Sequence, residues 1–295
     1  MGKASRTKVD ASRREKIAAQ RAAERKAQRR RQTLIAGGSV LAVLAVVAVL
    51  IGVKLASSGG SGGSGNGTAQ PAVVSAVTTI PAATTDAVGK GTSNPKMLIP
   101  LSGAPALTSG GKPEVLYMGA EYCPFCATER WAMLNALSRF GTFSNIRFIH
   151  SAADDTPASV PTLTFYQSGY SSKYVTFTPV EMQKIDKSTL QNPTSEQKAL
   201  LNKYDAPPYV QGGAGSIPFL DFGGKYIVSG ASYDYNVLSG KSYAQIAAAM
   251  KDPSTDIAKG ALGTANQMTA AICKLTGNQP ATACTASIKA LEAGL

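Results

Sequence analysis

Two apolar runs with an amphipathic stretch between them mark the middle of the chain. EVLYM at 114–118 has the composition of a buried strand, and NIRFIH at 145–150 predicts a second one. Between them, ATERWAMLNALSRFG at 127–141 places its large apolar residues three and four apart, which indicates a helix. A helix joining neighbouring strands implies a parallel pair with a right-handed connection. The pattern therefore predicts an α/β domain.

The segment 151–216 interrupts this simple alternation and is predicted to be an insertion of mixed character. TLTFY at 162–166 and KYVTFT at 173–178 alternate as a pair of strands. PTSEQKALLNKY at 193–204 predicts a helix capped by Thr194 or Ser195.

The remaining pattern predicts a hairpin, a helical C-terminal segment and two short helices near the start of the domain. FLDF and KYIVSG flank Gly223-Gly224, a two-residue turn able to supply positive φ, and predict a hairpin. From 242 to 295 the chain is Ala-rich and helical, with breaks near Pro253, Gly277 and Pro280. At 71–91 apolar spacing predicts two short helices, the second opened by Pro81 and ended by Gly89.

A long apolar run near the start predicts a membrane anchor. Residues 34–53 form 20 uncharged residues, which span roughly 30 Å as a helix. Secretory signal peptides have a shorter apolar region and a small-residue cleavage motif, so we expect an uncleaved transmembrane helix over 33–56. Three arginines precede the run and only Lys54 follows it, so the positive-inside rule leaves the N-terminus in the cytoplasm and the rest outside.

The net charge of +12 is mostly a property of the first segment. Residues 1–32 hold 12 Lys/Arg against 3 Asp/Glu, whereas the remainder holds 18 against 15. Because this basic tail adjoins the membrane, we interpret it as a topology signal that contacts anionic lipid, and no nucleic-acid partner is expected. A Gly/Ser linker at 57–70 then leads to an extracytoplasmic domain at 71–295.

The chemistry in the sequence is concentrated in EYCPFCATER at 121–130. A thiol exchanges disulfides only as the thiolate, and a helix N-terminus favours the thiolate through its partial positive charge and unpaired N–H groups. Pro124 suits the first helical position, which places Cys123 at the helix tip and Cys126 one turn inside. This spacing predicts that Cys123 forms the mixed disulfide and Cys126 resolves it.

The other two cysteines admit several interpretations. In an oxidising compartment Cys273 and Cys284 are expected to form a structural disulfide across the turn between the last two helices. A relay that passes electrons to Cys123 and Cys126 is the alternative if the two pairs approach each other. A zinc site using all four cysteines lacks the usual short spacing in its second half. The single histidine, His150, is predicted to be a strand-end residue.

The run EVLYMGAEYCPFCA at 114–127 resembles the active-site segment of the thioredoxin superfamily, with a strand followed by a C-x-x-C that opens a helix. The whole chain is most similar to membrane-anchored, Dsb-like thioredoxin-fold proteins of actinobacteria and archaea. The resemblance implies a thioredoxin-like domain, here with an inserted segment and a helical C-terminus.

The resemblance also implies a cis-proline opposite the dithiol, preceded by a residue whose backbone pairs with substrate. Pro161 and Pro218 are the candidates. Only ten residues separate His150 from Pro161, which is short for the required crossover, whereas Pro218 has a predicted helix before it and the hairpin after it. We therefore assign substrate positioning to Ile217 and Pro218.

The chain departs from the family where many thioredoxins carry a buried acid in the strand before the motif. Tyr117 occupies that position, so acid-assisted proton transfer is not expected from it.

Together these features predict a thiol-disulfide oxidoreductase that acts on protein cysteines with an unidentified redox partner and without a metal or organic cofactor. The alternative is an assembly or scaffold protein that keeps the thioredoxin shape and holds Cys123 and Cys126 in a static disulfide.

Overall fold

The computed structural model describes residues 67–212 and 215–295. The predicted basic tail at 1–32, the predicted transmembrane helix at 33–56 and linker residues 57–66 lie outside the described residues. Within the described ranges, no helix combines the length and the apolar composition needed to cross a bilayer.

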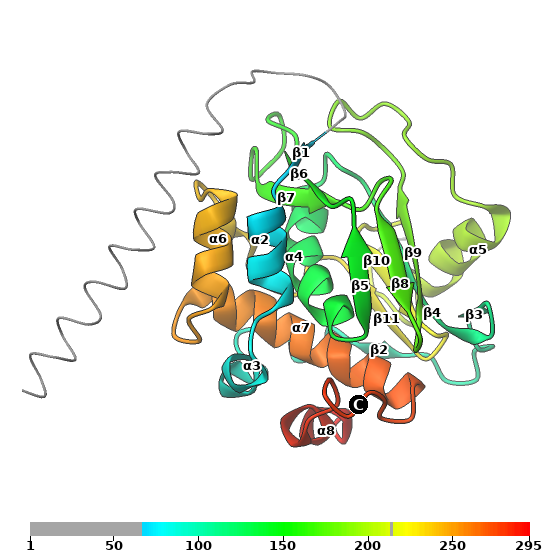
Figure 1. The fold of residues 1–295 in the computed structure, drawn as a ribbon. Coiled ribbons are helices and arrows are strands. Elements are labelled where there is room, and N and C mark those ends of the chain that lie inside the picture. Colours follow the sequence, from blue (N-terminus) through cyan, green and yellow to red (C-terminus); the bar gives the residue numbers. More distant parts are fainter. Residues whose placement is uncertain (1–66, 213–214) are drawn as a thin grey trace, which may run out of the picture. The chain divides into compact units, whose positions relative to one another are not determined.

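The described elements are arranged as a mixed sheet with helices on both faces (Figure 1). In chain order they are β1 (Thr68–Ala69), α2 (Pro71–Thr78), α3 (Ala82–Val88), β2 (Ile99–Pro100), β3 (Thr108–Ser109), β4 (Lys112–Gly119), α4 (Pro124–Ser138), β5 (Gly141–Ser144), β6 (Arg147–His150), β7 (Pro161–Thr164), β8 (Gly169–Ser172), β9 (Thr176–Glu181), α5 (Ser195–Tyr204), β10 (Phe219–Phe222), β11 (Tyr226–Ser229), the 3-10 helix η1 (Tyr235–Leu238), α6 (Tyr243–Met250), α7 (Asp256–Leu275) and α8 (Ala286–Glu292). The predicted α/β class is confirmed.

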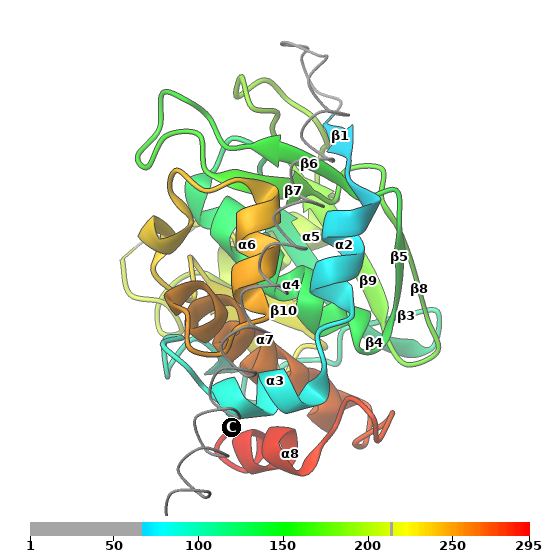
Figure 2. The same cartoon turned by 60° about the vertical axis from the view of Figure 1, so that its left-hand side comes forward.

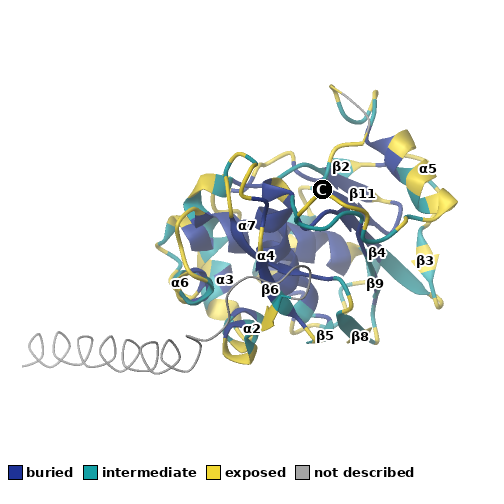
Figure 3. Ribbon diagram, turned by 90° about the horizontal axis from the view of Figure 1, so that it is seen from above, coloured by how far each residue is buried: buried dark blue, intermediate teal, exposed yellow. Residues whose placement is uncertain are grey.

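Strand β4 is the centre of the main sheet. It pairs parallel with β9 on one side, in register from Glu114 opposite Thr176 to Gly119 opposite Glu181. On the other side it pairs antiparallel with β10, which continues through β11 to β2. Successive β4 side chains alternate between two cores: Val115 packs on the α4 and α7 face, and Leu116 on the α5 face. This two-sided burial explains why 115–118 is apolar without interruption (Figure 3).

The predicted partner of β4 was wrong. Strand β6, within the predicted strand 145–150, pairs antiparallel with β1 and β7 in a separate sheet. The parallel neighbour of β4 is β9, which lies inside the segment 151–216 that was predicted to be an insertion. A strand inside a sheet that is covered on both faces must bury side chains in both cores. Strand β9 does so, with Phe177 in one core and Val180 in the other, whereas β6 contributes only Phe148, to one core.

The predicted pairing of 162–166 with 173–178 was also wrong. Strand β7 pairs with β6, and β9 pairs with β4. Strand periodicity identified both strands, but the choice of partner depends on which face each strand buries.

Several local predictions are confirmed. Thr194 caps α5 in a capping box with Gln197. The β10–β11 hairpin turns at Gly223 and Gly224, whose φ angles of 63° and 70° match a turn that needs positive φ twice. A Cβ on Gly224 would lie 2.1 Å from the carbonyl oxygen of Pro105, so a side chain there would also clash.

The short helices α2 and α3 pack against α4, α6 and α7 (Figure 2). Val73 and Val77 of α2 are buried. Asn266 of α7 donates to the carbonyls of Thr85 and Gly89 at 2.7 and 2.8 Å, so polar contacts fix α3 as well. The two short helices predicted at 71–91 are therefore present, and both pack on the domain.

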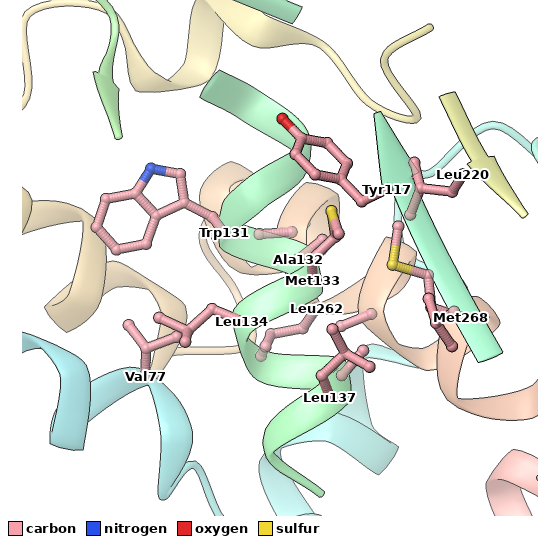
Figure 4. Packing of buried hydrophobic residues seen from close by; sticks show 14 of the residues in the cluster. Val77, Tyr117, Trp131, Ala132, Met133, Leu134, Leu137, Leu220, Leu262 and Met268 are labelled. Carbon is pink, nitrogen blue, oxygen red and sulfur yellow. The ribbon is translucent and has the colours of Figure 1, made fainter. Parts of the chain in front are cut away.

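Helix α4 lies at the centre of the larger core. Figure 4 shows Trp131 and Leu134 projecting from it on the side away from β4, with Leu134 beside Val77 of α2; both belong to the same core as Leu262 and Met268 of α7. Trp131 is fully buried and its Nε1 donates to the carbonyl of Pro161 at 2.9 Å. Trp131 is therefore a core residue.

Cys273 and Cys284 form the predicted disulfide, which joins the end of α7 to the segment before α8. Leu275 lies against Gly223 at the turn of the β10–β11 hairpin, whereas the sulfur of Cys123 faces Ile217 before the start of β10. Six extended residues between those points span about 20 Å, so the disulfide is too distant to exchange directly with Cys123 or Cys126. Because Cys273 and Cys284 bond to each other, the four-cysteine zinc set is not formed.

The double variant Cys273→Ala/Cys284→Ala is expected to lower the free energy of unfolding by about 3 kcal/mol, since the bond closes a short loop in the unfolded chain. Urea denaturation of the full chain measures this loss. The variant should keep the reactivity of Cys123 toward a small thiol reagent; an unchanged urea midpoint would contradict the structural role.

Candidate active site

Cys123 is the N-cap residue of α4, directly after the loop that leaves β4. Its backbone is extended, Pro124 occupies the first helical position, and its sulfur accepts a hydrogen bond from the backbone N–H of Cys126 at 3.3 Å. The sulfur therefore takes the role that a capping oxygen has in other helices. Both Cys123 and Cys126 are free thiols in the structure.

The two sulfurs differ in environment. The pKa of the Cys123 thiol is lowered, mainly by its hydrogen bond with the Cys126 side chain and further by the backbone N–H of Cys126 and the Arg130 charge. The pKa of the Cys126 thiol is raised well above its usual value by burial and by its hydrogen bond with Cys123. This asymmetry favours Cys123 as the thiolate and Cys126 as the protonated partner.

Cys123 is the outer sulfur, but it is recessed. Its residue is 3% exposed and that of Cys126 0% exposed, because Tyr122 and Ile217 pack against them. Cys123 lies at the helix tip, as predicted, but it is less open to solvent than that position suggests.

Ile217 and Pro218 face the dithiol. The Ile217–Pro218 peptide bond is cis, and the sulfur of Cys123 lies 3.8 Å from the carbonyl oxygen of Ile217. The register of β10 on β4, with Phe219 opposite Met118, brings this loop to the end of β4 from which the dithiol loop leaves. The other candidate, Pro161, begins β7, and its bond to Val160 is not among the cis bonds of the described residues.

Asp205, at the end of α5, holds the proline loop in place. Its carboxylate accepts a hydrogen bond from the backbone N–H of Ser216 and another from the hydroxyl of Ser229 at 2.5 Å. Asp205 is fully buried, and these two contacts join the loop to β11.

A groove of about 520 Å³ lies beside the dithiol. Its walls include Phe125 of the C-x-x-C motif, Ile217, and Tyr233 and Tyr235 from the segment after β11. Phe125 is the one large apolar side chain classed as exposed in the described part of the chain, at 38%, and it packs edge to face on Tyr235 at 5.2 Å between ring centroids. An exposed aromatic rim next to a reactive sulfur suits the binding of an extended peptide.

Glu129 fixes one wall of that groove from inside the fold. It is fully buried, and its carboxyl oxygens accept hydrogen bonds from the Ser232 hydroxyl at 2.6 Å and the Ser232 backbone N–H at 3.0 Å. The Tyr233 hydroxyl donates to the carbonyl of Thr128 at 2.9 Å. Burial raises the pKa of the Glu129 carboxyl to about 7, although both Ser232 contacts favour its charged form.

A buried ion pair lies beneath the dithiol. The Arg130 guanidinium donates from Nε and Nη2 to the two carboxylate oxygens of Glu181 at 2.9 and 2.6 Å, and neither residue is exposed. Nη2 also donates to the carbonyl of Ala120 at 2.6 Å. The pair joins α4 to β9 at the end of the sheet that carries the dithiol.

Sequence reasoning missed Glu129, Arg130, Glu181 and Asp205. Two consecutive charges inside an apolar helix were a usable signal for the first two, since buried charges require partners. Glu181 and Asp205 carried no such signal, because their burial arises only when β9 and β10 pair with β4 and α5 covers the sheet. His150 is exposed at the end of β6, as predicted, with its Nδ1 2.9 Å from the Tyr243 hydroxyl.

Glu129→Gln is expected to remove a pH dependence from stability. The folded carboxyl holds its proton up to a pKa of about 7, compared with an ordinary value of 4.5. Its contribution to stability is therefore fully present below pH 4.5 and is lost as the pH rises to about 7, which amounts to roughly 3 kcal/mol. Urea denaturation from pH 4.5 to 7.5 should show a flatter pH dependence for the variant.

Glu196→Gln is the matched control, because Glu196 is an exposed carboxylate in the first turn of α5 and should leave the slope nearly unchanged. Parallel stability curves for wild type and Glu129→Gln would show that Glu129 does not titrate in this range.

Comparison with known proteins adds one relationship. No curated protein and no solved structure gives a significant match to the chain. One protein family, described as "Domain of unknown function (DUF929)", matches residues 102–274, which begin before β4 and include the dithiol, the proline loop and nearly all of α7. Because that match covers more than half of the sequence, the chain belongs to the DUF929 family.

Proposed function

We propose that the protein is a thiol-disulfide oxidoreductase that acts on cysteines of other proteins. The observation that carries this proposal is the geometry of Cys123, whose sulfur caps α4 and faces the carbonyl of Ile217 directly before Pro218. In this proposal Cys123 is the nucleophile and Cys126 the resolving thiol, and a substrate strand pairs with the backbone at Ile217.

The arrangement of strands supports a thioredoxin-like interpretation of the fold. The proline strand β10 lies on the far side of β4 from the parallel strand β9, which is the arrangement that the resemblance of 114–127 implies. Helix α4 lies in the connection from β4 to β9, and α5 lies in the connection from β9 to β10. Helix α7 follows the hairpin.

The groove supports a protein substrate over a small thiol. Phe125 and Ile217 belong both to the surroundings of the dithiol and to the groove walls, so a bound extended segment reaches Cys123 from that side. The aromatic side chains Tyr233 and Tyr235 extend the surface beyond the reach of a single amino acid.

We further propose that the domain acts outside the cytoplasm, anchored by residues 33–56. The disulfide between Cys273 and Cys284 supports an oxidising compartment, because such bonds are rare in the cytosol. The charge asymmetry about residues 34–53 supports the same orientation.

Cys126→Ala is expected to accumulate a mixed disulfide between Cys123 and a partner protein, because the resolving thiol is missing. Full-length protein would be expressed in its native membrane, trapped with acid, and analysed by non-reducing electrophoresis and mass spectrometry of the cross-linked peptide. Cys123→Ala is the matched control and should give no adduct, since Cys126 is 0% exposed.

If Cys126→Ala gives no more adduct than Cys123→Ala, the exchange mechanism fails. The recessed position of Cys123 would then favour the alternative, a scaffold that uses the groove for binding and keeps the cysteines unreactive.

A further inference from the structure

Two buried hydrogen-bond donors lie beneath the dithiol without a partner. The hydroxyl of Tyr117 and the Nη1 of Arg130 have no hydrogen-bond acceptor among the described residues, and both side chains are fully buried. Leaving a donor unpaired inside a protein costs free energy, so two such groups side by side require a physical explanation.

The Tyr117 hydroxyl points into the same space as the Cys126 sulfur. A Cβ placed on Gly119 would lie 2.1 Å from the Tyr117 hydroxyl and 3.1 Å from the Cys126 sulfur, so both atoms border the volume that this glycine leaves empty. The Tyr117 ring projects from β4 toward α4 (Figure 4).

Arg130 approaches the same region from the helix. It lies four residues after Cys126 on α4 and therefore on the same face. Its Nη2 is held by the carbonyl of Ala120, which packs with the two cysteines, and its Cζ lies 5.8 Å from the centroid of the Tyr117 ring. The Glu181 carboxylate accepts from Nε and Nη2, and Nη1 has no acceptor among residues 67–212 and 215–295.

We infer that Tyr117 and Arg130 are positioning residues that stabilise the thiolate of Cys126. The inference rests on the proposed thiol exchange for its biological role, but it concerns a local property of one sulfur. Tyr117 supplies a neutral hydrogen-bond donor, and Arg130 supplies a fixed positive charge. At the position of Tyr117, many thioredoxins have a buried carboxyl instead.

The resolving step shows why this thiolate needs support. Cys126 loses its proton and attacks the Cys123 sulfur of the mixed disulfide; the bond between Cys123 and the substrate sulfur breaks as the Cys123–Cys126 bond forms. The electron pair leaves with the substrate sulfur, which gains a proton as Cys126 loses one. In the reverse direction Cys126 is the leaving group. Both directions pass through negative charge on a fully buried atom.

The surrounding charges determine which donors are available. Burial raises the pKa of the Tyr117 hydroxyl well above its usual value, so the phenol keeps its proton. Cys123, Arg130 and Glu181 are the other ionisable groups that act on it, while Cys123 and Arg130 act on Cys126. Arg130 is the only cation in this set, and it forms the ion pair with Glu181.

Tyr117→Phe tests the inference without disturbing the ion pair. In full-length protein with both cysteines present, Cys123 is first converted to its mixed disulfide with thionitrobenzoate. The pH dependence of thionitrobenzoate release, which requires attack by the Cys126 thiolate, gives the ionisation midpoint of Cys126. The midpoint in Tyr117→Phe is expected to move up by about one pH unit, which makes the release about tenfold slower below the midpoint.

Tyr170→Phe is the matched control, because its hydroxyl donates to the Leu137 carbonyl at 2.9 Å and lies at the far end of α4. It should lower the urea midpoint without moving the Cys126 profile. Tyr117→Phe should keep or raise the urea midpoint, since the lost hydroxyl had no partner.

Equal midpoints for Cys126 in Tyr117→Phe and Tyr170→Phe would overturn the inference, even if trapping shows that Cys123 exchanges with a partner. A midpoint shift confined to Tyr117→Phe would support the inference. If that shift were found but no partner were trapped, the proposed function would be contradicted and the inference about Cys126 would stand.

Discussion

The contact on which the arrangement of the dithiol depends is the buried ion pair between Arg130 and Glu181. It joins the helix that carries both free cysteines to the parallel neighbour of the central strand, and neither charge reaches solvent. Removing one member of such a pair leaves an uncompensated charge and typically costs about 3–5 kcal/mol, so the helix and strand are held in one relative position. The added contact from Arg130 to Ala120 extends that constraint to the loop from which Cys123 emerges.

Three separate parts of the chain meet around the sulfurs, and each is held by a buried polar contact. The N-cap geometry of Cys123 fixes the first, Asp205 fixes the proline loop, and Glu129 fixes the segment after β11. The apolar cores alone would allow these loops to shift, because dispersion contacts carry little directional preference. Hydrogen bonds donated to buried carboxylates restrict them, and the groove lined by Phe125 and Tyr235 is the result.

The polar groups beneath the dithiol are arranged differently from those around the groove. Glu129 and Asp205 are satisfied by their neighbours, whereas the Tyr117 hydroxyl and the Arg130 Nη1 have no acceptor in the part of the chain that the structure describes. Preorganised donors that are satisfied only when charge develops are a common way for a protein to stabilise a transient anion. Under the proposed function, Tyr117 in place of the acid of many thioredoxins therefore changes how the resolving sulfur is stabilised. The exchange mechanism itself stays the same.

The sequence by itself determined the features whose cause is local. The hairpin at Gly223-Gly224 follows from two adjacent residues that accept positive φ, the Thr194 cap follows from a hydroxyl three residues before a glutamine, and the place of Cys123 at the start of α4 follows from Pro124. Only the tertiary structure decided that β9 and not β6 lies beside β4, and that Arg130, Glu181, Glu129 and Asp205 come together around the dithiol. The physical reason is that strand pairing and the burial of a charge depend on groups distant in the chain, whose approach is set by the closing of the whole core rather than by any residue's neighbours in sequence.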